Sequence, residues 1–353
     1  MNKSSLTVLF LLLLVISACG NQPQPTPISN PTDPPPSQTP PSTELVPVIF
    51  DDDGSPDGTT ALMYLLNHPL ADLAAVNISY GEAHPEIYIQ HIGRQLESFG
   101  IVDLPLGYGQ DGPLAGENEF PEGVRQASND FWGQPIPYPE KTYPVQPSPE
   151  LIVSIINESP LPVTVFVSGP CTNLAQALQL DPGITNNIQA VYIMGGAVYA
   201  PGNIQDFYPE SENISAEWNI FADSQAASIV FESGVDIFLV PLDATNQVTI
   251  SREDTRQWRL GGGAADFAAD IYDMLLNNWG ADEAAIWDLM TAAIMLKPGL
   301  CGFEPLHLQV ITEAGSTSGQ TAVVPGEAAN ISVCLEPDAD GIRQTLIEIF
   351  SGE

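Results

Sequence analysis

The sequence predicts an α/β fold over residues 46–353, built on one open, mostly parallel sheet with helices on both faces. Short runs rich in Val, Ile and Phe alternate along this stretch with longer segments whose apolar residues recur at helical spacing. No second linker and no internal repeat interrupts it. About 300 residues are enough for one such domain with a full core.

The predicted elements follow one another in a regular order. A strand over 46–50 leads through an acidic turn into a helix that carries Ala61 and Leu62. Further strands are expected at 71–78, 162–168, 189–194 and 235–242, and helices at 85–99, 173–180, 224–233, 264–276 and 282–296. This alternation is typical of a Rossmann-like sheet.

The first 45 residues have a different character. Residues 1–18 carry one charge, Lys3, and an apolar run too short to span a membrane. Small residues just before a lone Cys19 resemble a bacterial lipoprotein signal, with an ordinary secretory signal as the alternative. Residues 19–45, rich in Pro, Ser and Thr, then form a tether. We therefore expect an exported protein, lipid-anchored to the cell envelope through Cys19.

The charge balance restricts the partners. The chain has 44 acidic against 9 basic residues, a net charge of −35. Such a surface repels nucleic acid polymers, anionic lipid and nucleotides, while a neutral small molecule or a cation is compatible with it. The sequence leaves the oligomeric state open, a homo-oligomer included.

Three cysteines follow Cys19. An exported chain permits a disulfide between Cys301 and Cys334, and two free thiols are the alternative. We expect Cys171 to be a small buried side chain, because no His lies near it in the sequence to activate a nucleophile.

The first predicted strand ends in three adjacent carboxylates, Asp51–Asp53, and Asp57 follows after a turn. In open α/β sheets, ligands bind in the crevice at the carboxyl ends of the strands. Adjacent carboxylates repel one another unless a cation, a proton or water offsets the charge. The alternative is an Asp-rich turn in which Asp57 or Thr59 caps the next helix.

Other polar groups follow later strands. A Gly-Pro-Cys-Thr-Asn turn contains Thr172, a Met-Gly-Gly turn ends at Gly196, and Asn203, Glu217 and Asn219 come next. Asn and Glu side chains provide the donors and acceptors that sugar hydroxyls require. Asp288 opens an apolar helix, where a carboxylate is costly to bury unless it is paired or binds a metal. Singly, each could be a surface or capping residue.

In this order, the five segments resemble the inosine–uridine-preferring nucleoside hydrolase family over about residues 46–350. Asp51, Asp53 and Asp57 match its Asp-x-Asp-x-Gly-x-Asp-Asp signature. The resemblance implies the nucleoside hydrolase fold. It also implies hydrolysis of the N-glycosidic bond of ribonucleosides to free base and ribose, with a calcium-activated water.

The resemblance also implies individual roles. Asp53 would be the general base and a calcium ligand, and the Thr172 carbonyl and Asp288 would be the other metal ligands. Asp57 would hold the 2′ hydroxyl of the sugar. Further substrate contacts would come from Asn203, Glu217, Asn219, Trp287 and Asp288.

Several positions depart from the family pattern. Gly58 replaces an Asp that is normally a bidentate calcium ligand, so Asp51, Asp52 or water would have to fill the gap, or calcium would bind weakly or not at all. Glu82 stands where relatives usually have Asn, and Asn246 where many have His.

The residue before Asp288 is often His in the family. Trp287 stands there and resembles the purine-preferring branch, in which aromatic rings sandwich the base. Phe131 or Trp132 could supply a second ring.

A non-catalytic lipoprotein of the same fold that binds nucleosides or another glycoside is the competing hypothesis. Gly58 and Glu82 favour such a binder, whereas the intact Asp53 and Asp288 favour an enzyme.

Overall fold

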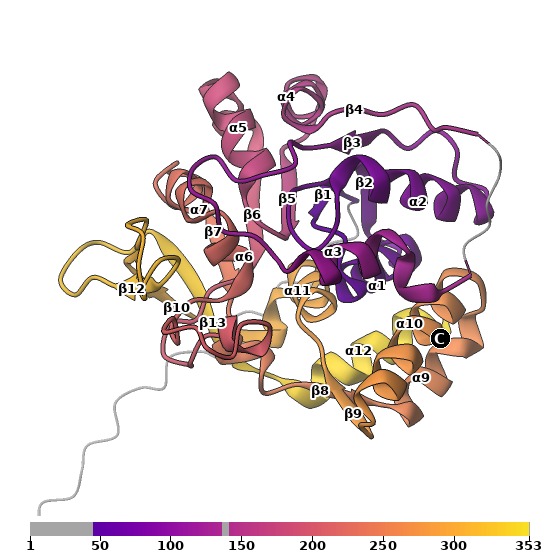
Figure 1. The fold of residues 1–353 in the computed structure, drawn as a ribbon. Coiled ribbons are helices and arrows are strands. Elements are labelled where there is room, and N and C mark those ends of the chain that lie inside the picture. Colours follow the sequence, from indigo (N-terminus) through magenta and orange to yellow (C-terminus); the bar gives the residue numbers. More distant parts are fainter. Residues whose placement is uncertain (1–44, 136–140, 353) are drawn as a thin grey trace, which may run out of the picture. The chain divides into compact units, whose positions relative to one another are not determined.

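The computed structural model describes residues 45–135 and 141–352. Its centre is a nine-stranded sheet in the order β10-β13-β7-β6-β5-β1-β2-β3-β4 (Figure 1). The strands are β1 (Val46–Asp52), β2 (Ala71–Ile78), β3 (Leu106–Tyr108), β4 (Gln146–Pro147), β5 (Val163–Ser168), β6 (Ile188–Met194), β7 (Ile237–Val240), β10 (Cys301–Leu306) and β13 (Ile331–Pro337). Neighbouring strands are parallel, apart from the edge strand β10, which is antiparallel to β13.

Helices cover both faces of the sheet, as the sequence predicts. One layer consists of α1 (Pro56–Asn67), α2 (Pro85–Ser98), α10 (Gly263–Trp279), α11 (Asp288–Leu296) and α12 (Ala339–Ser351), and the other of α4 (Ser148–Glu158), α5 (Thr172–Leu180) and α7 (Ser224–Phe231). Strand β1 separates the two cores. Its Val48 and Phe50 pack into the first, and Ile49 packs into the second.

Shorter elements complete the fold. Helices α3 (Glu122–Asn129), α6 (Trp218–Ala222), α8 (Leu242–Thr245) and α9 (Arg252–Trp258) lie in the connections. Two small antiparallel ribbons pair β8 (Thr249–Ser251) with β9 (Glu283–Ala285) and β11 (Leu308–Val310) with β12 (Thr321–Val323). None of the helices in the described residues is long and apolar enough to cross a lipid bilayer.

The connectivity reverses at β1. From β1 the chain adds β2, β3 and β4 on one side, and then returns to place β5, β6 and β7 on the other. Neighbouring loops diverge at such a switch point and leave a crevice at the carboxyl ends of the strands. Asp51 and Asp52 end β1 beside Ile78 and Ser168, the last residues of β2 and β5.

Two predicted elements need correction. The predicted helix 282–296 begins only at Asp288, because residues 283–285 pair with β8 as strand β9. The carboxylate of Asp57 accepts the backbone N–H groups of Trp287 and Asp288 and so satisfies donors that a helix start leaves unpaired. The predicted strand 235–242 is paired only over 237–240, and helix α8 begins at Leu242.

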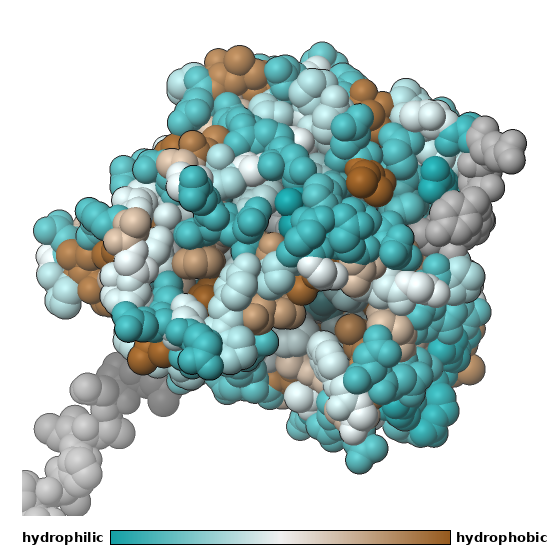
Figure 2. Space-filling model, viewed as in Figure 1, coloured by the Kyte–Doolittle hydropathy of each residue, from teal (hydrophilic) through white to brown (hydrophobic). Residues whose placement is uncertain are grey.

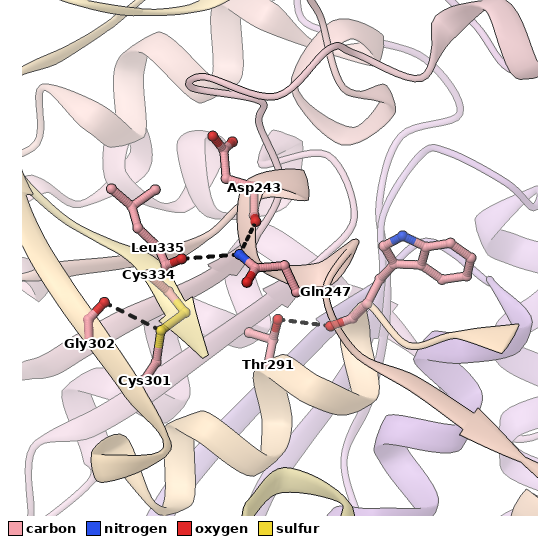
Figure 3. The surroundings of a disulfide bond; sticks show 8 residues. Asp243, Gln247, Thr291, Cys301, Gly302, Cys334 and Leu335 are labelled. Carbon is pink, nitrogen blue, oxygen red and sulfur yellow. Dashed lines mark hydrogen bonds between the residues drawn. A yellow bond between two sulfur atoms is a disulfide. The ribbon is translucent and has the colours of Figure 1, made fainter. Parts of the chain in front are cut away.

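The structure decides between the two alternatives for Cys301 and Cys334 and confirms the prediction for Cys171. Cys301 and Cys334 form a disulfide between β10 and β13, with their Cα atoms 5.8 Å apart (Figure 3). Cys171 is a buried free thiol. The predicted signal peptide (1–18) and the tether with Cys19 (19–45) lie almost wholly outside the described residues and stay predictions.

Removing the disulfide should destabilise the fold. Because the bridge joins residues 33 apart, the double variant Cys301→Ala/Cys334→Ala should lose about 3–4 kcal/mol of unfolding free energy. Urea unfolding followed by circular dichroism measures the loss. Reductant should destabilise the native protein and leave the double variant unchanged, and equal unfolding midpoints for the two proteins would contradict the prediction.

Candidate active site

A cavity of about 600 Å³ lies at the carboxyl ends of the central strands. The last residues of β5 and β6 and the segments that follow β1, β2, β3 and β6 form it, together with the end of α10 and the start of α11. Seven predicted site residues line it together, although they come from distant parts of the chain: Asp53, Asp57, Asn203, Glu217, Asn219, Trp287 and Asp288. Ser55, Glu82, Ser168 and Met194 also line it.

Asp53 follows β1 directly and is almost completely buried. Its Oδ2 accepts the backbone N–H of Glu82 at 3.1 Å. Two glycines make room for its side chain. A Cβ on Gly81 would lie 2.2 Å from the Asp53 Oδ2, and one on Gly169 would lie 2.6 Å from the Asp53 Cβ. The surrounding backbone therefore holds this carboxylate in one place.

Asp57 joins three elements around the cavity. Its Oδ2 accepts the N–H groups of Trp287 at 2.7 Å and Asp288 at 2.5 Å, and its Oδ1 accepts the Tyr272 hydroxyl. Ser55 donates to the Asp288 Oδ2 at 2.9 Å and also accepts from the first turn of α1. In Figure 1, α1 and α11 lie next to each other beside the end of β1. Asp57 therefore positions Trp287 and Asp288, besides facing the cavity.

The residues predicted to bind sugar come from the segment that follows β6. Glu217 accepts the N–H groups of Gly196 at 2.9 Å, Asn219 at 2.9 Å and Ile220 at 3.2 Å. The Asn219 amide donates to the Met194 carbonyl at 3.1 Å, and the Asn203 Oδ1 accepts from Trp218. These bonds orient the three side chains and link β6 to the start of α6.

Aromatic side chains form two walls of the cavity. Trp287 and Trp279 meet edge to face with ring centroids 6.3 Å apart, and Trp132 also lines the cavity. On the second wall Phe120 stacks on Trp218 at 4.4 Å, beside Phe207. Elsewhere, the face drawn in Figure 2 is mostly hydrophilic, and its hydrophobic residues form small separate groups.

Sequence reasoning partly failed for these rings. The prediction that Phe131 could face the base is wrong, because this side chain is fully buried and stacks on Tyr88 and Phe267. Trp279, Tyr272 and the second wall were missed. Trp279 follows ordinary helical residues, so only the tertiary structure, which brings the end of α10 to Trp287, reveals its place. Its large apolar ring directly before the helix-ending Gly280 was the one available signal.

The carboxylates of Asp53, Glu82 and Asp288 line the cavity and concentrate negative charge there; we call this part of the lining the cavity floor. Burial and neighbouring carboxylates raise the pKa of Asp52 to about 7 and that of Glu82 to about 8. The same causes, burial foremost, raise the pKa of Asp53 and of Asp288 well above the usual range. Each group would be stabilised in its charged form by a cation placed among them.

The calcium ion that the resemblance implies can be tested against these donors. Buried carboxylate oxygens with unbalanced charge are ligands that calcium prefers. Within the described residues, however, no three acidic, His or Cys side chains already converge as a metal-binding group. Calcium thus fits the chemistry of the donors, although the described carboxylates do not already converge on one point.

Thr172 lies apart from the other predicted residues. It opens α5, is fully buried, and is absent from the residues that line the cavity. Its hydroxyl donates to the Asp223 Oδ2 at 2.8 Å, and Asp223 also caps α7. These contacts fix the turn after β5, which carries the Thr172 backbone.

The fold and the cavity define a class of protein: an α/β protein with an acidic, aromatic-walled site for a small polar ligand at a topological switch point. Comparison with known proteins then identifies the family. A family model described as inosine-uridine preferring nucleoside hydrolase matches residues 48–344. The chain belongs to this family and is an N-glycosyl hydrolase that acts on ribonucleosides, as the sequence predicts.

Individual relatives agree with this assignment. The pyrimidine-specific ribonucleoside hydrolase RihA of Citrobacter koseri is 31% identical over 313 residues, which cover 86% of this chain and 97% of that protein. A purine-preferring ribonucleoside hydrolase from Gardnerella vaginalis superimposes with a TM-score of 0.76 at 24% identity, over 87% of this chain and 98% of that one. An inosine-uridine preferring nucleoside hydrolase from Bacillus anthracis gives a TM-score of 0.71 at 23% identity, over 88% and 100%. The two superpositions confirm the predicted fold.

The glycine beside Asp53 provides a test of the site. Gly81→Ala should displace the Asp53 carboxylate and lower kcat/KM for ribonucleosides by about 100-fold, because the new methyl group would overlap it. Gly112→Ala is the control, since a Cβ there meets nothing within 4 Å. Steady-state kinetics measures the effect. Equal activity of two folded variants would show that the position of Asp53 is not critical.

Proposed function

We propose that this chain hydrolyses the N-glycosidic bond of purine-type ribonucleosides to free base and ribose, with a bound calcium ion. The observation that carries the proposal is one cavity that combines buried Asp53 and Asp288, the side-chain amides of Asn203 and Asn219, and several indole rings. The sugar and the base thus have separate surfaces of suitable chemistry.

The residues of the chain have distinct tasks in this reaction. Asp53 takes a proton from the attacking water, whose oxygen bonds to C1′ of the ribose as the bond from C1′ to the base nitrogen breaks. Burial raises the pKa of Asp53, which makes its carboxylate a stronger proton acceptor. Surrounding carboxylates also favour the positive charge that develops on the sugar ring.

In this proposal the polar residues after β6 bind the sugar. Asn203, Glu217 and Asn219 bind ribose hydroxyls, and the hydrogen bonds that orient them prepare this geometry before substrate arrives. Asp57 and Asp288 bind further hydroxyls. The Glu217 carboxylate, held by three N–H groups, acts as an acceptor.

The base stacks on Trp287, and Trp132 and Trp279 extend this apolar surface. Stacking on an electron-rich indole favours protonation of the departing base, which takes this proton from solvent water as the bond to C1′ breaks. A bicyclic purine covers more of this surface than a pyrimidine does. The aromatic area supports a purine preference here, although RihA of Citrobacter koseri is named as pyrimidine-specific.

Calcium would be held by Asp53, Asp288 and the Thr172 carbonyl, and when bound it lowers the pKa of a coordinated water. The high pKa of the two carboxylates supports this assignment, because it marks sites where a cation would relieve repulsion. The substitution at Gly58 requires a further ligand.

We also propose that the enzyme works at the bacterial cell envelope, held by a lipid on Cys19. The run Ile16-Ser17-Ala18-Cys19 after an apolar segment supports this, and the Pro-rich stretch 20–45 would keep the catalytic domain clear of the membrane.

Reducing-sugar release from a panel of purine and pyrimidine ribonucleosides, with calcium and with chelator, tests the function. Purine nucleosides should be cleaved faster, and chelator should slow the reaction. Asp53→Asn should lower kcat by about 10²–10⁴-fold, because it removes the base. Faster pyrimidine cleavage would overturn the purine preference, and full activity in chelator would overturn the calcium requirement. Binding without any cleavage would favour a capture protein.

Replacing Trp287 tests the base-stacking surface. Trp287→Leu should cost about 1–3 kcal/mol in kcat/KM for inosine, because stacking is lost. The loss should be smaller for uridine, which serves as the internal control within the same variant. Equal losses for both substrates would indicate that Trp287 supports the site without contacting the base.

A further inference from the structure

Gly58 lies in the first turn of helix α1, two residues after the start of the helix at Pro56. Glycine weakens a helix by about 1 kcal/mol relative to alanine. Its backbone has no positive φ that would call for glycine. The reason is steric. A Cβ at position 58 would lie 1.7 Å from Asp52 Oδ1 and 2.5 Å from Asp52 Cγ.

The carboxylate of Asp52 therefore occupies the volume in which a side chain at position 58 would begin. Two hydrogen bonds hold it there: the Ser168 hydroxyl donates to Oδ1 and the Gly54 N–H donates to Oδ2, each at 2.9 Å. Asp52 is almost completely buried, and Ser168 lines the cavity. The side chain thus lies just below the cavity floor.

The neighbouring carboxylate, that of Asp51, makes different contacts from those of Asp52. Asp51 precedes Asp52 on β1, where alternate side chains point to opposite faces, and its Oδ1 accepts from Asn173. Of the two carboxylates that could replace a ligand at 58, only Asp52 fills the space beside Gly58.

We propose that Asp52 supplies the carboxylate that Gly58 lacks, so that the cation is held by a ligand from the end of β1 in place of one from the first turn of α1. This inference rests on the calcium site of the proposed function. It makes positions 52 and 58 a matched pair: Asp at 52 requires Gly at 58, and Asp at 58 requires a small residue at 52.

Calorimetric titration of calcium into the metal-stripped protein tests the pair. Asp52→Asn should weaken calcium binding about tenfold or more, because one charged ligand is lost. Asp51→Asn is the matched control: it removes the same charge one residue away and should change the affinity by less than about threefold. The two variants separate ligation from general charge.

The exchanged pair provides the sharper test. Gly58→Asp alone should fold less stably and bind calcium worse than the native protein, because its Cβ overlaps the Asp52 carboxylate. Combining it with Asp52→Ser removes the overlap and should restore calcium affinity to within about tenfold of the native value. Thermal unfolding with and without calcium provides a second readout.

Three outcomes would overturn the inference: equal losses in Asp52→Asn and Asp51→Asn, a folded exchanged pair that binds no calcium, or no calcium uptake by the native protein. Sugar release assayed in parallel keeps the two proposals apart. Hydrolysis without calcium uptake leaves the proposed reaction standing and removes the Asp52 assignment. Calcium uptake that depends on Asp52 but accompanies no hydrolysis does the reverse.

Discussion

The buried carboxylates at the end of β1 are the constraint on which the rest of the structure depends. Asp51, Asp52 and Asp53 lie together with Asp57 and Asp288 at the switch point of the sheet, and burial raises the pKa of each. Removing so much charge from water is unfavourable unless hydrogen bonds, protons or a cation offset it. The surrounding N–H groups and hydroxyls donate hydrogen bonds to these carboxylates, and the glycines leave room for them.

Asp57 shows how the same charges organise the fold. Its carboxylate accepts from the start of α11 and from Tyr272 of α10, so one side chain in α1 fixes two distant helices. The residues that it positions, Trp287 and Asp288, carry the base-binding and sugar-binding tasks of the proposed reaction. Stability and function therefore depend on one network, and a change at Asp57 would disturb both.

Different parts of the cavity lining have different chemistry. The acidic floor suits a sugar that becomes positively charged, and the indole wall suits a flat aromatic base. The polar residues after β6 include Glu217, which joins β6 to α6. The acidic and aromatic residues meet at Trp287 and Asp288, which are adjacent in the chain, while Trp132 and Trp279 come from other segments. RihA of Citrobacter koseri, named as pyrimidine-specific, is 31% identical to this chain, and the purine-preferring hydrolase of Gardnerella vaginalis shares its fold.

The sequence by itself determined the fold class, the family and most of the cavity. Strand and helix periodicity predicted β1, β2 and α2 closely, because apolar residues recur along their core faces at the spacing of a strand or a helix. Ordered motifs predicted Asp53, Glu217 and Asp288. Only the tertiary structure decided which residues meet through packing: that Phe131 is core, that Trp279 joins the indole wall, and that Asp52 fills the space beside Gly58. Such contacts depend on how the helices pack on the sheet, and the spacing of residues along the chain does not predict this packing.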